Sequence, residues 1–244
     1  MGKPLFRVIS CDQHVERRER FYASAAAAHL PKVTLQRGVD GRAMMPKHVS
    51  AMVRRGVIHK RATLTTIEVA ISLSHRKCWQ ALVRSKASHM VVFEDDCTLS
   101  PDFHTQLLSI LADGPRFDIL HLVNGNWNQT RTWRERVGRV NALTIYRETL
   151  PHIPGTGCYV IHRDFAQVLL SLQLPIRYAV DGFIGYTRVK RHKHFTLETT
   201  KGEDGLYTIS PVVEVYPAII GSEWSTQRYD DAKVAEIIRQ TQSL

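Results

Sequence analysis

An apolar run that ends in three successive carboxylates constrains this chain more than any other feature. The segment "VVFEDDCTLSPDF" covers residues 91–103 and places Glu94, Asp95 and Asp96 directly after a strand-like stretch. Burying three like charges at the end of a strand is unfavourable unless a positive group faces them. Ligands of open α/β sheets bind outside the carboxyl ends of the strands, so the position of this cluster predicts a ligand site.

Strands and helices alternate over the first half of the chain, which predicts an α/β sheet flanked by helices. The second half is more irregular, and without a linker or a repeat a single domain over residues 1–244 is expected. Thr65 and Glu68 have the spacing of a capping box, whereas residues 42–61 lack a pattern and suggest a loop. We expect strands at 5–10, 32–37, 88–94, 117–123, 155–162 and within 206–217, a hairpin within 124–152, and helices at 15–29, 63–85, 101–111, 163–172, within 175–193 and at 230–240.

Composition narrows the partners and the compartment. Lys and Arg exceed Asp and Glu by ten, which favours anionic partners such as nucleic acid, phosphorylated substrates or an anionic membrane face. The four cysteines are far apart and suit free thiols in a reducing compartment. No apolar stretch has the length of a membrane span or a signal peptide, so we expect a cytoplasmic protein.

Strand geometry divides the three carboxylates. In a straight strand Glu94 and Asp96 project to one side and Asp95 to the other. The i and i+2 positions lie roughly 6–7 Å apart, so Glu94 and Asp96 suit two neighbouring tasks better than one shared cation. Carboxylate ligands favour Mg²⁺ or Mn²⁺, which in turn bind phosphates. The alternative is an acidic patch at the start of the next helix, where the helix dipole favours negative charge.

Several segments in order resemble glycosyltransferase family 25, which includes bacterial lipooligosaccharide galactosyl- and glucosyltransferases and procollagen galactosyltransferases. The acidic segment is similar to the family's acidic motif, and the resemblance covers roughly residues 5–190. The matching segments are "FRVISCDQHVERRERF", "GVDG", "LTTIEVAISLSHRKCWQAL", "GTGCYVIHRDFAQVLL" and "YAVDGFIGY". The residues after Glu68, "VAISLSH", depart from the small residues that the family usually carries there.

The resemblance implies a GT-A fold with a Rossmann-type sheet, in which residues 1–123 bind the nucleotide-sugar and residues 124–244 face the acceptor. It implies transfer of a hexose from a UDP-sugar, with inversion, to a lipooligosaccharide or related glycan. Asp96 would hold Mn²⁺ or Mg²⁺, and Glu94 or Asp95 would take ribose or sugar hydroxyls. Asp181 would be the general base, although it could equally cap the helix that follows it.

Other residues have both a functional and a structural interpretation. Arg17 could approach the donor phosphates or lie on a solvated helix surface. Gly155 and Gly157 flank Thr156 and allow close approach of the donor to the backbone, or simply a tight entry into a strand. His75 follows Ser74 on the long helix and could act directly or pack.

The basic run "RVKRHKH" (188–194) could attract a phosphorylated lipid-linked acceptor or the inner face of an anionic membrane. Two other functions remain open at this point. One is a metal-dependent nuclease, although the scattered basic residues argue against a nucleic-acid partner. The other is a module on the same fold that binds nucleotide-sugar or glycan without turnover.

Overall fold

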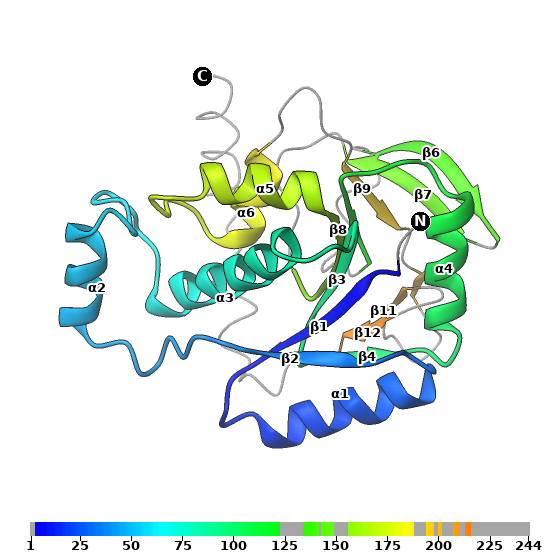
Figure 1. The fold of residues 1–244 in the computed structure, drawn as a ribbon, viewed down its shortest axis with the longest axis horizontal. Coiled ribbons are helices and arrows are strands. Elements are labelled where there is room, and N and C mark those ends of the chain that lie inside the picture. The colour runs from blue at the N-terminus through cyan, green and yellow to red at the C-terminus, as the bar shows by residue number, and fades with distance from the viewer. Residues whose placement is uncertain are drawn as a thin grey trace.

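The computed structural model describes residues 3–122, 134–141, 143–148, 156–187, 194–197, 200–201, 207–209 and 213–215. Within these residues a mixed eight-stranded sheet forms the centre of the molecule (Figure 1). Its strands, in spatial order, are β2 (Val33–Arg37), β1 (Leu5–Ser10), β3 (His89–Glu94), β8 (Cys158–His162), β5 (Ile119–His121), β9 (His194–Leu197), β7 (Leu143–Glu148) and β6 (Arg134–Val140).

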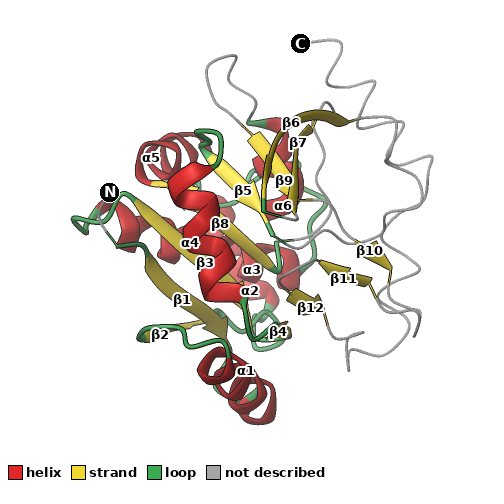
Figure 2. Cartoon of the chain, turned by 90° about the vertical axis from the view of Figure 1, so that its right-hand side faces the viewer, coloured by secondary structure: helices red, strands yellow, loops and turns green. Residues whose placement is uncertain are grey.

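β8 lies near the centre of the sheet and differs from the first three strands in its direction. β1 runs parallel to both β2 and β3, but β8 is antiparallel to its two neighbours, β3 and β5. A smaller antiparallel sheet lies beside the main one (Figure 2). It consists of β10 (Thr200–Lys201), β11 (Tyr207–Ile209), β12 (Val213–Val215) and β4 (Cys97–Leu99).

Helices cover both faces of the main sheet, so the fold has three layers (Figures 1 and 2). On one face, α1 (Val15–Ala27) and α4 (Phe103–Asp113) pack through residues such as Phe21 and Phe103. On the other face, α3 (Thr66–Val83), α5 (Arg163–Leu172) and α6 (Val180–Tyr186) pack through residues such as Trp79 and Phe165. The α/β sheet flanked by helices that the sequence predicts is therefore confirmed.

Alternation along the central strands divides the core into two clusters. In β3, Val91 and Phe93 contribute to the α1 side, whereas Met90 and Val92 contribute to the α3 side. β8 follows the same rule, and Tyr159 lies on the α3 side. A strand covered on both faces reads as a continuous apolar run, which is why "MVVF" and "CYVI" show no polar alternation.

Two local predictions are wrong, and the strand β4 was missed. Residues 42–61 contain a helix, α2 (Pro46–Arg54), which begins with Pro46 at its first position and buries none of its side chains. Its apolar residues do recur with a helical period, so the sequence held a helix signal that was missed among its basic residues. The helix predicted from Pro101 begins at Phe103 with Asp102 at its N-cap. The strand β4, whose partner β12 lies far along the chain, was not predicted.

Two further observations concern partners and location. Within the described part of the chain, no helix combines the length and the apolar character needed to cross a membrane. The helix predicted at 230–240 and residues 188–193 of the basic run lie outside the described residues. All four cysteines are free; Cys78, Cys97 and Cys158 are buried, and Cys11 is partly exposed.

Candidate active site

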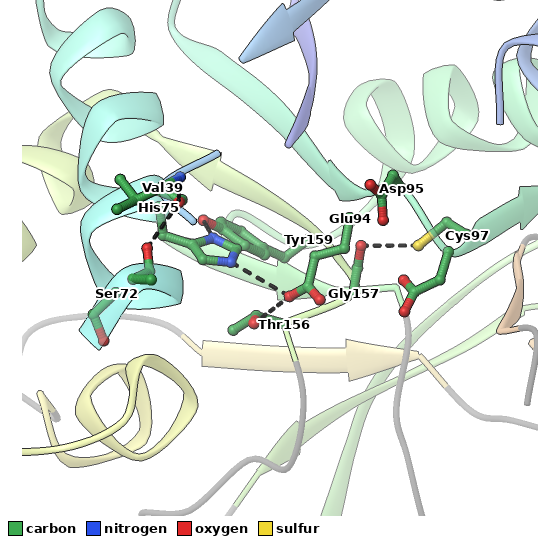
Figure 3. A network of polar contacts seen from close by, with 12 residues as sticks. Val39, Ser72, His75, Glu94, Asp95, Cys97, Thr156, Gly157 and Tyr159 are labelled. Atoms are coloured by element: carbon green, nitrogen blue, oxygen red, sulfur yellow. Dashed lines mark hydrogen bonds and ion pairs between the residues drawn. The ribbon is translucent and has the colours of Figure 1, made fainter. Parts of the chain in front are cut away.

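The acidic cluster lies at one edge of the main sheet, where three segments meet. β1 and β3 are parallel, so both carboxyl ends reach this edge. β8 is antiparallel to β3, so its first residues arrive at the same place, and the amide of Glu94 donates to the carbonyl of Gly157 over 2.7 Å. The thiol of Cys97 contacts the same carbonyl at 2.9 Å. This arrangement brings Glu94 and Asp95 next to the entry of β8 (Figure 3), and Asp96 follows them in the turn before β4.

Asp95 and Asp96 face a basic partner from within the chain. One nitrogen of Arg17, Nη2, lies 2.8 Å from Oδ1 of Asp95 and 2.8 Å from Oδ2 of Asp96. His14 lies three residues earlier, at the N-cap of α1, and its Nδ1 is 3.1 Å from Oδ2 of Asp95. The side chain of Asp95 is only 5% exposed, which explains why it needs these contacts.

The predicted division of the carboxylates is therefore half correct. Glu94 points toward α3 and Asp95 toward α1, as strand alternation requires. Asp96 shares Arg17 with Asp95 instead of a face with Glu94. The reason is that β3 ends at Glu94 and the chain turns at Asp95 and Asp96 before β4.

Glu94 is held by two side chains on its Oε1 atom. The hydroxyl of Thr156 donates to this oxygen over 2.7 Å, and Nε2 of His75 lies 3.4 Å from it. Burial raises the pKa of Glu94, but the polar contacts of His75 and Thr156 and the charge of Arg17 outweigh it and hold the pKa below its usual value. Glu94 is therefore an ionised acceptor.

His75 continues the network into the core. Its Nδ1 lies 2.9 Å from the hydroxyl of Tyr159, which also accepts a hydrogen bond from Nε1 of Trp79 over 2.9 Å. All three side chains are at most 1% exposed. Ser74, next to His75, accepts from the amide of Val39 and so ties the loop after β2 to α3. Figure 3 shows His75 reaching from α3 toward Glu94.

Asp96 carries the least compensated negative charge of the cluster. Burial and the neighbouring charge of Glu94 raise the pKa of Asp96 to about 7, even though Arg17 acts in the opposite direction. Asp96 is still 18% exposed, so a ligand can reach it. Among the described residues, no group of three or more His, Cys, Asp or Glu side chains converges as a metal site.

The remaining predicted residues are placed as follows. Thr156 contacts Glu94, and Arg17 joins the cluster by binding the aspartates. Gly155 lies outside the described residues. Asp181 lies in the first turn of α6, where its Oδ1 accepts from the amide of Gly182; Ala179 is the N-cap, so the capping interpretation of Asp181 is wrong. α6 packs on α3, with Phe183 beside Trp79.

Two members of the network were not predicted, His14 and Tyr159. The i, i+3 spacing of His14 and Arg17 puts both on one side of a helix and is the signal that could have paired them. Tyr159 sits in an apolar strand, where nothing in the local sequence separates a core tyrosine from one that bonds a histidine.

A pocket of about 410 Å³ lies at the opposite end of β1. Its lining combines basic residues, among them Lys3, Arg7 and Lys32, with apolar ones such as Phe6 and Leu108. None of the three carboxylates lines it. The acidic edge of the sheet, with its converging charged groups, is therefore the candidate active site.

The sequence matches the family described as "Glycosyltransferase family 25 (LPS biosynthesis protein)" over residues 4–184. The match covers most of the chain and includes both the acidic cluster and the residues of α3 and β8 that surround it. The chain belongs to glycosyltransferase family 25 and is therefore a member of a transferase family.

Similar proteins include two curated relatives of greater length. A glycosyltransferase 25 family member of Anopheles gambiae is 30% identical over 105 residues, 41% of this chain and 16% of that protein. A Bos taurus protein named "Probable inactive glycosyltransferase 25 family member 3" is 27% identical over 191 residues, 72% of this chain and 30% of that protein. The chain thus spans less than a third of the length of each.

Among solved structures, the apo form of the glycosyltransferase GlyE of Streptococcus pneumoniae TIGR4 is similar at 12% identity. The likeness covers 80% of this chain and 46% of that one, with a TM-score of 0.41.

Proposed function

We propose that this chain is a metal-dependent glycosyltransferase that moves a hexose, galactose or glucose, from a UDP-sugar to a lipooligosaccharide or related glycan, with inversion. The observation that carries the proposal is the cluster Glu94, Asp95 and Asp96 at the carboxyl edge of the sheet in a chain of glycosyltransferase family 25. Asp95 and Asp96 share one guanidinium and Glu94 adds a third carboxylate beside them, which leaves an excess of negative charge for a cation.

The donor set fits Mn²⁺ or Mg²⁺. Such ions are commonly bound by one or two carboxylates together with substrate phosphates and water, so a cluster of three protein ligands is not required. Asp96 is the carboxylate that would hold the ion, because it is partly exposed and its charge is the least compensated. When bound, the cation would neutralise the charge that develops on the leaving diphosphate.

The chain's own residues would divide the remaining tasks. Glu94, ionised and 28% exposed, would accept a ribose or sugar hydroxyl. Arg17 would hold Asp95 and Asp96 in place and add positive charge near the diphosphate. Asp181 would take the proton of the acceptor hydroxyl as general base. Thr156 orients Glu94, and Gly155 would let the donor approach the backbone.

The proposed partners follow from the charge of the chain. A formal net charge of +10 favours an anionic acceptor, such as a phosphorylated lipid-linked oligosaccharide, over a neutral one. The same charge would support peripheral contact with the inner, anionic face of a membrane from the cytoplasm. Binding of the anionic acceptor and contact with the membrane would both weaken as the ionic strength rises.

The test is a screen of UDP-sugars for hydrolysis and transfer with Mn²⁺ present. We expect one UDP-hexose to be consumed, and EDTA to abolish the reaction. Asp96→Ala should lower kcat/KM by at least about 100-fold, since it removes a transition-state interaction. Asp102→Asn is the matched control, because Asp102 lies on the same segment but is exposed at the N-cap of α4. Activity that survives both EDTA and Asp96→Ala would contradict the mechanism.

Binding without transfer is the outcome that the screen must separate from catalysis. The Bos taurus relative is named as an inactive family member. Calorimetric binding of UDP with Mn²⁺, without any sugar release, would reassign this chain as a binding module on the same fold. If UDP does not bind and no sugar is released, the nucleotide-sugar is no longer part of the proposal.

A further inference from the structure

We propose that two hydrogen bonds, from Trp79 to Tyr159 and from Tyr159 to His75, form a directed relay that aims Nε2 of His75 at Glu94, 3.4 Å away. This longer polar contact positions Glu94 and leaves its Oε2 atom to bind a hydroxyl of the donor. His75 and Tyr159 are thus positioning residues, and Glu94 is the residue that touches the ligand. The identity of the ligand rests on the proposed function, whereas the direction of the relay stands on the geometry of this chain alone.

The direction of the relay follows from the donors available. An indole Nε1–H can only donate, so Trp79 donates to the oxygen of Tyr159. Burial raises the pKa of Tyr159 well above its usual value, so the phenol keeps its proton. The nitrogen Nδ1 of His75, 2.9 Å away, is the acceptor that the structure offers to this proton. Nδ1 therefore carries a lone pair, and the proton of the neutral ring is on Nε2.

The opposite tautomer would be unfavourable at both ends of the ring. With the proton on Nδ1, the tyrosine oxygen would receive two donors, and its own O–H would lose the acceptor at 2.9 Å. The lone pair on Nε2 would then face Oε1 of Glu94 at 3.4 Å, which is repulsive. In the Nε2–H tautomer both contacts are attractive. Because His75 is 1% exposed, water does not compensate for the wrong arrangement.

The relay ends on one oxygen of Glu94. Both His75 and Thr156 contact Oε1, so the carboxylate is fixed from two directions, by α3 and by the start of β8. Within the described residues, no hydrogen bond or ion pair engages Oε2. The Glu94 side chain is 28% exposed. A carboxylate oxygen that is oriented by its neighbour and has free lone pairs, at the rim of a site, suits a hydroxyl donor such as those of a nucleotide-sugar.

The first test measures the tautomer directly and needs no ligand. In the full chain labelled with ¹⁵N-histidine, long-range ¹H–¹⁵N spectra at pH 8 report which ring nitrogen carries the proton, and His75→Gln identifies the signals. We expect Nδ1 of His75 to be unprotonated and Nε2 protonated. Tyr159→Phe should shift the Nδ1 signal of His75, whereas Tyr22→Phe, which removes a hydroxyl on α1, should not. A protonated Nδ1, in the other tautomer or in a charged ring, would overturn the relay.

The second test measures the consequence for the donor. Calorimetry with the UDP-hexose identified by the screen should give a dissociation constant roughly tenfold higher for Tyr159→Phe than for the wild type or Tyr22→Phe, as expected for losing an oriented charged hydrogen bond. His75→Gln, which keeps one donor and one acceptor, should retain more affinity than His75→Leu. Equal affinities of Tyr159→Phe and the wild type would contradict the positioning role.

The two tests separate the failure of the relay from the failure of the proposed function. If no UDP-sugar binds, the glycosyltransferase proposal fails, while the tautomer still decides whether the relay exists. If UDP-sugar is consumed but Nδ1 of His75 is protonated, the relay fails and the proposed function stands. Comparing UDP with the UDP-hexose then assigns the hydroxyl: a loss of affinity for both ligands indicates the ribose, and a loss for the UDP-hexose alone indicates the sugar.

Discussion

Arg17 binds two carboxylates, those of Asp95 and Asp96, through a single nitrogen. This contact supplies positive charge to the acidic cluster from within the chain. The Arg17 side chain is 20% exposed and Asp95 only 5%, so the pair with Asp95 is largely shielded from water. A shielded ion pair adds little net stability when intact, but removing one partner leaves a buried charge that is costly. Removing Arg17 would therefore lower the free energy of unfolding by more than the intact ion pair adds to it.

We expect Arg17→Met to lower the free energy of unfolding by about 2–3 kcal/mol, because Asp95 would lose its guanidinium partner. Urea denaturation followed by circular dichroism measures the change. Arg20→Met, at an exposed position of the same helix, should change stability by less than about 1 kcal/mol. Adding Asp95→Asn to Arg17→Met should recover part of the loss. An Arg17→Met variant as stable as Arg20→Met would contradict the role of Arg17.

We expect His121 to make stability depend on pH. Burial lowers its pKa to about 3, compared with about 6.5 in an unfolded chain. The folded protein keeps the ring neutral and the unfolded chain binds a proton, so stability is fully present above pH 6.5 and falls as the pH drops toward 3. The slope approaches about 1.4 kcal/mol per pH unit for this one proton. We expect His121→Gln to reduce the slope between pH 6 and 4.5 by about that amount, measured by urea denaturation at several pH values. An unchanged slope would show that His121 is not the group responsible.

For single residues, the sequence predicted those that lie together in a short segment. It did not predict which residues from distant segments contact them. The cluster 94–96 could be picked out because charges after an apolar strand are unusual, and Thr156 came with the segment that resembles the family's Gly-Thr-Gly strand. The partners of Asp95 and Glu94, His14 and His75, come from helices 81 and 19 positions away. The packing of helices on the sheet decides which of these residues meet, and local sequence patterns do not predict that packing.

α3 is the element that connects most parts of the site. Its N-terminus begins with a capping box in which Thr65 accepts from the amide of Glu68 and Glu68 accepts from the amide of Thr65. Its middle turns carry Ser74 and His75, and its next turn carries Trp79. A shift of this helix along its axis would therefore move the relay and the loop after β2 together.

We expect Thr65→Ala to lower the free energy of unfolding by about 1 kcal/mol, because it removes the side-chain acceptor at the N-cap. Thr63→Ala, exposed and just before the helix, is the matched control and should change stability by less than about 0.5 kcal/mol. Thermal unfolding by calorimetry compares them. Equal stabilities of the two variants would mean that the capping box does not hold the start of α3.

The prediction of elements succeeded for α3 and α5 and failed for α2 and for the start of α4. α3 and α5 follow the 3.6-residue period of their buried residues, and the capping box marked the start of α3. α2 has a helical period too, but it is short and lies in a basic stretch, and this period was not recognised. The start of α4 was placed two residues early because Ser100 and Pro101 resemble a cap and first turn, whereas the chain first makes a turn there.

On the scale of the whole molecule, β8 joins the two parts of the chain. It is drawn from residues after 124 but pairs with β3 and β5 from the first part. The sheet therefore crosses the division between the donor-side and acceptor-side parts that the family resemblance implies. Both faces of β8 are buried, so neither part completes the core without the other.

We expect a fragment of residues 1–123 not to fold as a stable unit, because it leaves the edges of β3 and β5 without their shared neighbour. Urea denaturation should show no cooperative transition for this fragment, in contrast to the full chain. In the full chain, Val160→Ala, at the centre of β8, should cost about 2–4 kcal/mol as a fully buried position. A cooperative transition of the fragment would contradict this account and define an independent donor-side domain.

Because β8 comes late in the chain, β3 is synthesised well before the strand that pairs with it. Phe93 of β3 pairs with Cys158 of β8, which leaves the ribosome 65 residues later. At about 5–20 residues per second this interval lasts roughly 3–13 seconds. During that time one side of β3, whose residues 90–93 are all apolar, lacks its partner, and the three carboxylates that follow these residues discourage pairing with other nascent chains. The acidic segment would thus act as a gatekeeper before it acts as a binding site.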